Sequence, residues 1–217
     1  MINFIKKLFF VCLIFLFNTN VLALSSSSFL ISQSAYKNYD YSSTLFNFNT
    51  DKIKLSQDGL LDKAIAAVIT EDINLAKDIA DTILEKNINN QEAYIIKISS
   101  LYLDKKYNQI KELRNSLEQP NDLLEFIFFT NNDIKDNTTI SRSLVEIVAS
   151  SFSNNEQRLL NYNFLLFYIS LAQLIDPQNE RAIVIKAELF DQVGQFEVAR
   201  KSFEKIGMES PYYLDAQ

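Results

Sequence analysis

Several residue types on which protein chemistry commonly relies are absent or scarce in this sequence. Its 217 residues include no histidine and no tryptophan, one cysteine and three glycines. The lack of histidine excludes imidazole acid–base catalysis, a Ser-His-Asp triad and histidine-ligated zinc. Because glycine usually makes up about 7% of a protein, Gly-rich phosphate loops and tight β-turns are mostly excluded as well. The composition therefore favours a helical chain.

The overall balance of residues is that of a folded protein. Apolar residues make up 47% and charged residues 22% of the chain. The net charge is −6, and no long run of lysine or arginine indicates a nucleic-acid surface. No acidic spacing typical of a calcium loop occurs either. We therefore expect no metal site, no cofactor and no nucleic-acid partner.

The N-terminus has the order of a secretory signal peptide. A basic leader, "MINFIKK", is followed by ten apolar residues (8–17), a polar "NTN" and Val21-Leu22-Ala23. Cleavage after Ala23 removes Cys12, so no disulfide can form in the mature chain. The alternative is an uncleaved membrane anchor, although ten residues are too few to cross about 30 Å of hydrocarbon. We predict export, to the periplasm of a Gram-negative bacterium.

The last part of the chain has the pattern of a helical hairpin. Two apolar stripes with helical spacing flank Gly194, the first formed by Ile183, Ala187 and Phe190 and the second by Phe196, Ala199 and Phe203. Gly194 suits the left-handed end of the first helix. The small Ala199 lets the two helices approach closely.

This hairpin resembles a tetratricopeptide repeat. Pro177 and Pro211 are 34 residues apart, the period of that family. Lys186 stands where the family usually has leucine. The other matching positions are Ile183, Ala187, Phe190, Ala199, Phe203 and Pro211. The resemblance implies an all-α fold, a right-handed α-solenoid of antiparallel helix pairs.

Earlier segments repeat the pattern more loosely. Ile73, Ala76, Ala80 and Ile83 match the second helix of the hairpin, and Tyr107 follows Ile73 by 34 residues. Thr44 takes the place of the small alanine near the mature N-terminus. The predicted organisation is a signal peptide (1–23), degenerate repeats (24–118), an irregular join (119–140) and a second group of repeats (141–217) whose best match is 180–213.

The resemblance also implies a function. Helical solenoids expose a concave surface that binds peptides or proteins, lined in this family by the first helix of each pair. We predict a non-catalytic protein-interaction scaffold of the cell envelope. The residues that this geometry places on the surface are Ile95, Ser99, Tyr102, Arg181, Glu188 and Gln192. Plain solvent exposure is the alternative for all six, and the family's lysine and asparagine clamp for a terminal carboxylate is not present among them.

The sequence is consistent with two other functions. One is a structural subunit of an envelope assembly. The other is a carboxylate-based hydrolase, for which Glu188 and Asp191 lie one helical turn apart.

The end of the chain predicts an exposed edge. Three residues, Tyr212, Tyr213 and Leu214, are too few to cover a face that contains Phe190, Phe196 and Phe203. We therefore expect an exposed apolar C-terminal edge that belongs to a longer array or docks a partner or a second copy. The alternative is that the short tail folds back and caps the edge.

Overall fold

The structure, a computed structural model, describes residues 27–50, 55–117, 121–131, 133–153 and 161–213. The predicted signal peptide, residues 1–23, lies outside these ranges. The chain forms two compact units, 1–55 and 56–217, which are described separately. Among the described residues, no helix is long and apolar enough to cross a membrane.

The first unit contains a helical hairpin. A helix over residues 27–37 is followed by α2 (Tyr41–Thr50), and the turn between them contains Tyr39. The rings of Tyr36 and Tyr41 meet edge to face, with centroids 6.0 Å apart. Thr44 is fully buried, although polar, because its hydroxyl donates to the carbonyl of Asp40 at 2.7 Å. Aromatic contacts thus hold a hairpin with few charges.

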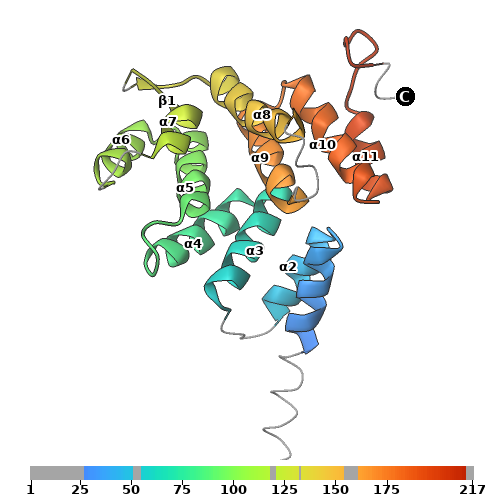
Figure 1. The fold of residues 1–217 in the computed structure, drawn as a ribbon, viewed down its shortest axis with the longest axis horizontal. Helices are drawn as coiled ribbons and strands as arrows, with labels where there is room; N and C mark the ends of the chain where they lie inside the picture. The colour runs from blue at the N-terminus through green and yellow to red at the C-terminus, as the bar shows by residue number, and fades with distance from the viewer. Residues whose placement is uncertain (1–26, 51–54, 118–120, 132, 154–160, 214–217) are drawn as a thin grey trace, which may run out of the picture. The chain divides into compact units, whose positions relative to one another are not determined.

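The second unit is built of helices and one short two-stranded ribbon (Figure 1). Its elements are α3 (Gln57–Ile69), α4 (Ile73–Leu84), α5 (Gln91–Leu103), α6 (Tyr107–Asn115), α7 (Asp122–Phe128), β1 (Phe129–Thr130), β2 (Asp133–Ile134), α8 (Asn137–Ser153), α9 (Tyr162–Ile175), α10 (Glu180–Gln192) and α11 (Phe196–Phe203). The strands pair antiparallel, with Phe129 opposite Ile134. The predicted fold class, all-α with antiparallel helix pairs, is confirmed.

Four helix pairs, one in the first unit and three in the second, share one turn geometry. In each, a residue with positive φ lies two positions after the last residue of the first helix. These residues are Tyr39 (59°), Glu71 (68°), Lys105 (59°) and Gly194 (78°). The following N–H then donates back to a carbonyl five residues earlier, as Gln195 does to Phe190 at 2.8 Å. Five residues after the turn residue, the second helix contributes a buried side chain: Thr44, Ala76, Ile110 and Ala199. The four pairs therefore share one helix–turn–helix backbone geometry.

The asparagine-rich connections have a structural role as helix caps. Side-chain oxygens of Asp72, Asn90, Asn121 and Asn179 each accept a hydrogen bond from the N–H three residues later. Such caps satisfy backbone donors that have no partner inside the helix. These four helices therefore begin at an aspartate or asparagine cap.

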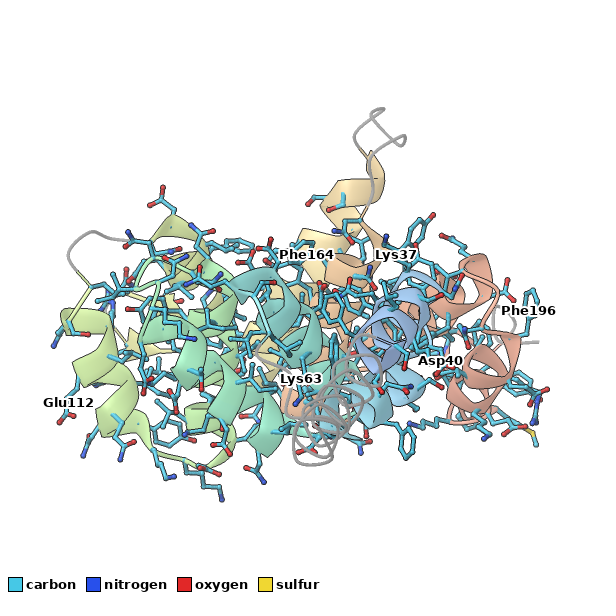
Figure 2. The ribbon with its side chains drawn as sticks, turned by 90° about the horizontal axis from the view of Figure 1, so that it is seen from below. Lys37, Asp40, Lys63, Glu112, Phe164 and Phe196 are labelled. Carbon is cyan, nitrogen blue, oxygen red and sulfur yellow. The ribbon has the colours of Figure 1, made fainter. Side chains whose placement is uncertain are left out.

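The helices of the second unit form two groups that meet at α3 and α9. Helices α3 to α6 follow one another, as do α8 to α11, and α9 also packs against α3 (Figure 1). Figure 2 shows Glu112 of α6 and Phe196 of α11 at opposite ends of this unit. Leu166, Phe167 and Ile169 of α9 are fully buried because helices cover several sides of α9. The centre of the core lies there.

The irregular join is a compact structure rather than an open loop. The Tyr102 hydroxyl donates to the side-chain oxygen of Asn137 at 2.7 Å and lies 3.2 Å from the carbonyl oxygen of Lys135. The side chain of Asp136 accepts from the N–H of Thr139 at 2.8 Å, so α8 begins at Asn137 and not near residue 141 as predicted. Helix α9 begins at Tyr162.

Candidate functional site

The six predicted partner-binding residues divide into a buried and an exposed set. Ile95 and Ser99 are 0% exposed and Tyr102 is 5% exposed, whereas Arg181, Glu188 and Gln192 of α10 are exposed. The first three face inward because α7 and α9 pack against α5 in addition to its neighbours α4 and α6. Buried side chains cannot line a surface for a partner. Partner binding by the three α10 residues stays a prediction.

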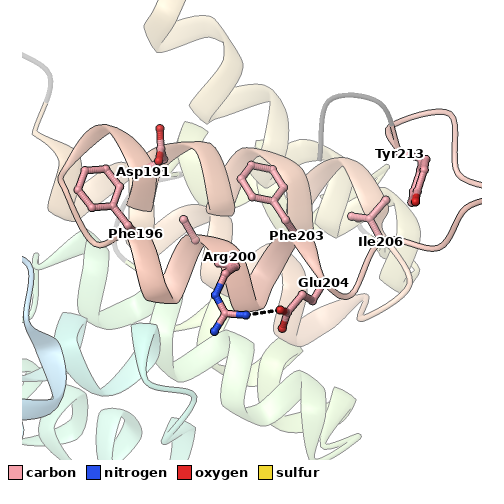
Figure 3. A pocket seen from close by; sticks show the side chains of 8 residues that line it. Asp191, Phe196, Arg200, Phe203, Glu204, Ile206 and Tyr213 are labelled. Carbon is pink, nitrogen blue, oxygen red and sulfur yellow. Dashed lines mark hydrogen bonds and ion pairs between the residues drawn. The ribbon is translucent and has the colours of Figure 1, made fainter. Parts of the chain in front are cut away.

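A groove along α11 is lined in part by apolar side chains (Figure 3). It has a volume of about 420 Å³. Figure 3 shows Phe196 and Phe203 projecting from the same helix, with Arg200 and Glu204 joined by an ion pair beside them. The full lining is Asp191, Phe196, Ala199, Arg200, Phe203, Glu204, Ile206 and Tyr213.

The amphipathic sequence of α11 produces this groove. Ala199 and Ser202 are buried on the side that packs against α10. Phe196, one turn before Ala199 on the same helix, is 65% exposed, an unusual state for so large an apolar side chain. The charge of Arg200 is paired with Glu197 (2.9 Å) and Glu204, so the groove has no unpaired cation of its own. Its strongest feature is the exposed apolar surface.

The segment after α11 covers part of the predicted apolar edge. Tyr212 and Tyr213 pack against a cluster formed by Ile183, Val184 and Ile206. The Ser210 hydroxyl donates to the Glu180 carboxylate at 2.7 Å and ties this segment to the start of α10. These contacts leave a smaller exposed edge than the sequence indicates.

The three phenylalanines of that edge have different environments. Phe190 is 3% exposed, Phe203 is half-buried, and Phe196 remains open. Leu214 lies outside the described residues. The exposed part of the edge therefore centres on Phe196.

An ion pair between a buried lysine and an exposed glutamate connects the two groups of helices. The side chain of Lys186 is 7% exposed, and its ammonium lies 3.5 Å from a carboxylate oxygen of Glu71, at the turn between α3 and α4. Burial lowers the pKa of Lys186, and the nearby Glu71 carboxylate opposes that shift. The sequence shows the lysine at a position that normally holds leucine, but no local pattern indicates its partner 115 residues away.

The residues proposed for a hydrolase do not form an enclosed pair. Glu188 and Asp191 are both on the exposed side of α10. Asp191 lines the α11 groove, whose lining does not include Glu188. In the part of the chain that the structure describes, no group of three or more cysteine, aspartate or glutamate residues could hold a metal ion.

Comparisons with known proteins find only distant likenesses. No protein-family model matches the chain, and no curated protein does. Among solved structures, "MamA MSR-1 C2" is 14% identical with a TM-score of 0.36, over 83% of this chain and 93% of that one. "MamA AMB-1 P212121" is 15% identical with a TM-score of 0.37, over 88% and 96% of the two chains. At these scores the likeness carries no argument about function.

Proposed function

We propose that this protein is a non-catalytic protein-interaction scaffold of the cell envelope that self-associates through the α11 groove. The observation that carries the proposal is the exposed apolar surface at this groove. Phe196, which lines the groove, is 65% exposed, and Phe203 beside it is half-buried. Exposed apolar surface beside a groove is typical of a protein–protein contact.

The partner that fits the groove best is the hairpin of residues 27–50 from a second copy. In that hairpin Leu30, Ile31 and Phe46 are 66%, 52% and 69% exposed. Lys37 and Asp40 are its only charged side chains. A helix pair of a repeat protein cannot bury its apolar face alone and is stabilised by stacking on a neighbour. Because groove and hairpin are different surfaces, this contact is head-to-tail and extends to further copies.

Sedimentation velocity over a range of protein concentrations tests the contact. We expect association that increases with concentration and that Phe196→Lys or Phe46→Lys abolishes. Ile88→Lys is the matched control, because Ile88 is 62% exposed but lies outside both surfaces. A mixture of the Phe196→Lys and Phe46→Lys proteins retains one intact contact and should form dimers without longer chains. A protein that stays monomeric at every concentration contradicts the proposal, and so does loss of association in Ile88→Lys.

The envelope location rests on the N-terminal sequence. Export with removal of residues 1–23 gives a mature protein whose first residue is Leu24. N-terminal sequencing of the protein from a periplasmic fraction measures this directly. Recovery of Met1 on a membrane-bound protein contradicts cleavage.

A further inference from the structure

Helix α6 is held to the rest of the second unit by little apolar contact. Figure 1 shows it at the edge of that unit, beside α5. Among the residues of α6, all of which the structure describes, only Ile110 is buried, and Leu113 and Arg114 are half-buried. Helix α4, the second helix of the preceding pair, buries four residues and packs extensively against both α3 and α5. The apolar core therefore stabilises α6 far less than α4.

The start of α6 is also weakly stabilised. Lys106, where α6 begins, provides no side-chain hydrogen bond to the described first turn. At the start of α4, by contrast, the side chain of Asp72 accepts from the N–H of Leu75 at 3.1 Å. The first N–H groups of a helix have no partner inside it, so those of α6 depend on water. A helix with few buried contacts and solvated backbone groups is among the first parts of a protein to open.

One ion pair compensates for this weak packing. The Arg114 guanidinium donates two hydrogen bonds to the carboxylate of Glu125 in α7, from Nε to Oε1 at 2.6 Å and from Nη2 to Oε2 at 2.8 Å. The guanidinium carbon also lies 4.6 Å from the centre of the Phe129 ring. Such bidentate pairs are stronger than ordinary exposed pairs. The pair between Lys111 and Asp133 is longer, at 3.7 Å, and more exposed, so it contributes little.

We propose that α6 is a cover on α5 that opens while the rest of the second unit stays folded, and that the Arg114–Glu125 pair keeps it closed. Opening removes the Tyr107 ring, which meets the Tyr102 ring edge to face with centroids 5.6 Å apart. Tyr102 is one of the residues that the sequence predicts to bind a partner, and it is buried while α6 is closed. The open form thus presents a part of α5 that the closed form covers. This device goes beyond the proposed self-association, because α6 belongs to neither of the two surfaces involved.

Hydrogen–deuterium exchange measured by mass spectrometry tests the proposal on the whole protein. After correction for the intrinsic rates of each sequence, we expect the amides of α6 to exchange about tenfold or more faster than those of α4. Raising the salt concentration from about 0.05 M to about 1 M screens the ion pair and should accelerate exchange in α6 but not in α4. Both measurements use the original protein, so they do not depend on the folding of a variant.

Glu125→Gln tests the ion pair directly. This change removes the carboxylate that binds Arg114 and leaves the sequence of α6, and hence its intrinsic exchange rates, unchanged. Exchange in α6 should accelerate about fivefold, with no change in α4, and most of the salt effect should disappear. The matched control is Asp122→Asn, because Asp122 is an exposed acid in the same first turn of α7. It removes the same charge but keeps the carboxylate bound to Arg114, so exchange in α6 should stay as in the original protein.

The other outcomes contradict the proposal. Equal exchange of α6 and α4 in the original protein would show that α6 opens only when the whole unit unfolds. Equal exchange of α6 in Glu125→Gln and the original protein would show that the ion pair does not keep it closed, and so would equal acceleration by Asp122→Asn. Faster exchange of α4 as well as α6 in Glu125→Gln would assign the pair to the stability of the whole unit and overturn its role as the closing contact.

Discussion

The α10/α11 pair and the α5/α6 pair share a turn but pack differently. Both first helices end at a residue with positive φ, Gly194 and Lys105. Five residues later the second helix contributes Ala199 in one pair and Ile110 in the other. Helix α11 contacts its partner far more extensively than α6 does, and Ile110 is the only buried residue of α6.

The difference separates two requirements of the repeat. The turn depends on a backbone conformation that several residue types adopt here, since glutamate, lysine and tyrosine occupy it as well as glycine. Extensive contact between the two helices of the α10/α11 pair is found together with a small side chain, Ala199, at the point where they cross. The α3/α4 pair supports this view, because it has Ala76 at the crossing and also packs extensively. In these three pairs, the extent of contact between the helices therefore depends on the residue at the crossing more than on the residue at the turn.

The largest effect is expected at the crossing itself. Ala199 is 2% exposed, so Ala199→Phe forces a large ring between α10 and α11 and should lower the free energy of unfolding by about 1–3 kcal/mol. Urea denaturation followed by circular dichroism measures the change. Val198→Phe is the control, because Val198 is 40% exposed on the same helix and should change stability little. Equal stability of Ala199→Phe and the original protein would show that Ala199 is not the crossing residue.

An effect of about 1 kcal/mol is expected at Lys186, which connects the α10/α11 pair with the α3/α4 pair. Lys186→Met removes a buried charge and keeps a side chain of similar length. Its partner Glu71 has a side chain that is 53% exposed and stays hydrated. Burial disfavours the Lys186 ammonium, and its removal leaves the remaining Glu71 carboxylate in water rather than buried without a partner, so we expect a gain of about 1 kcal/mol at pH 7. A loss of stability in urea denaturation would instead assign the ion pair a net stabilising role.

The free energy of unfolding should depend on pH differently in the original protein and in Lys186→Met. The folded pKa of Lys186 is below its ordinary value of 10.5 because burial disfavours the ammonium, with Glu71 opposing and Lys205 reinforcing this shift. The unfolded chain thus binds more protons in that range, and stability should rise with pH between the folded and the unfolded pKa. Lys186→Met should lack this rise. Tyr102 and Tyr168, whose pKa burial raises to about 12, destabilise both proteins equally as pH rises above 10, so the difference between the proteins isolates Lys186.

Much of the helical architecture could be predicted from the spacing of apolar residues. The stripes around Gly194 place α10 and α11, and Ala76 and Thr44 occupy the buried positions that the repeat assigns to them. These features are local, since each depends on residues within about one repeat. The start of α8 also depends on a local feature, the cap at Asp136, which lies within the range predicted as an irregular join (119–140).

The candidate surfaces could be predicted only in part, because exposure depends on contacts between distant segments. Ile95 and Ser99 have the spacing of an open helix face, but both are fully buried, since α3, α7 and α9 pack against α5 in addition to α4 and α6. The Lys186–Glu71 pair likewise joins segments that no repeat pattern relates. The exposure of Phe196 was predicted correctly because α11 contacts only α10 extensively.

The smallest effect is expected at the turn residue. Gly194 has φ of 78°, and a Cβ added there meets no atom within 4 Å. Gly194→Ala therefore tests the backbone alone and should cost about 1 kcal/mol, the penalty for a left-handed alanine. Gly207→Ala is the matched control, because its Cβ is equally free and its backbone is not in the left-handed range. Lys105→Gly is the reciprocal change in the α5/α6 pair and should recover less than about 1 kcal/mol, since glycine also increases the entropy of the unfolded chain. Urea denaturation of all three proteins measures these differences. If Gly194→Ala and Gly207→Ala lower the free energy of unfolding equally, the left-handed backbone at position 194 has no cost for alanine. Glu71 and Lys105 would then occupy the same turn position without needing compensation from helix packing.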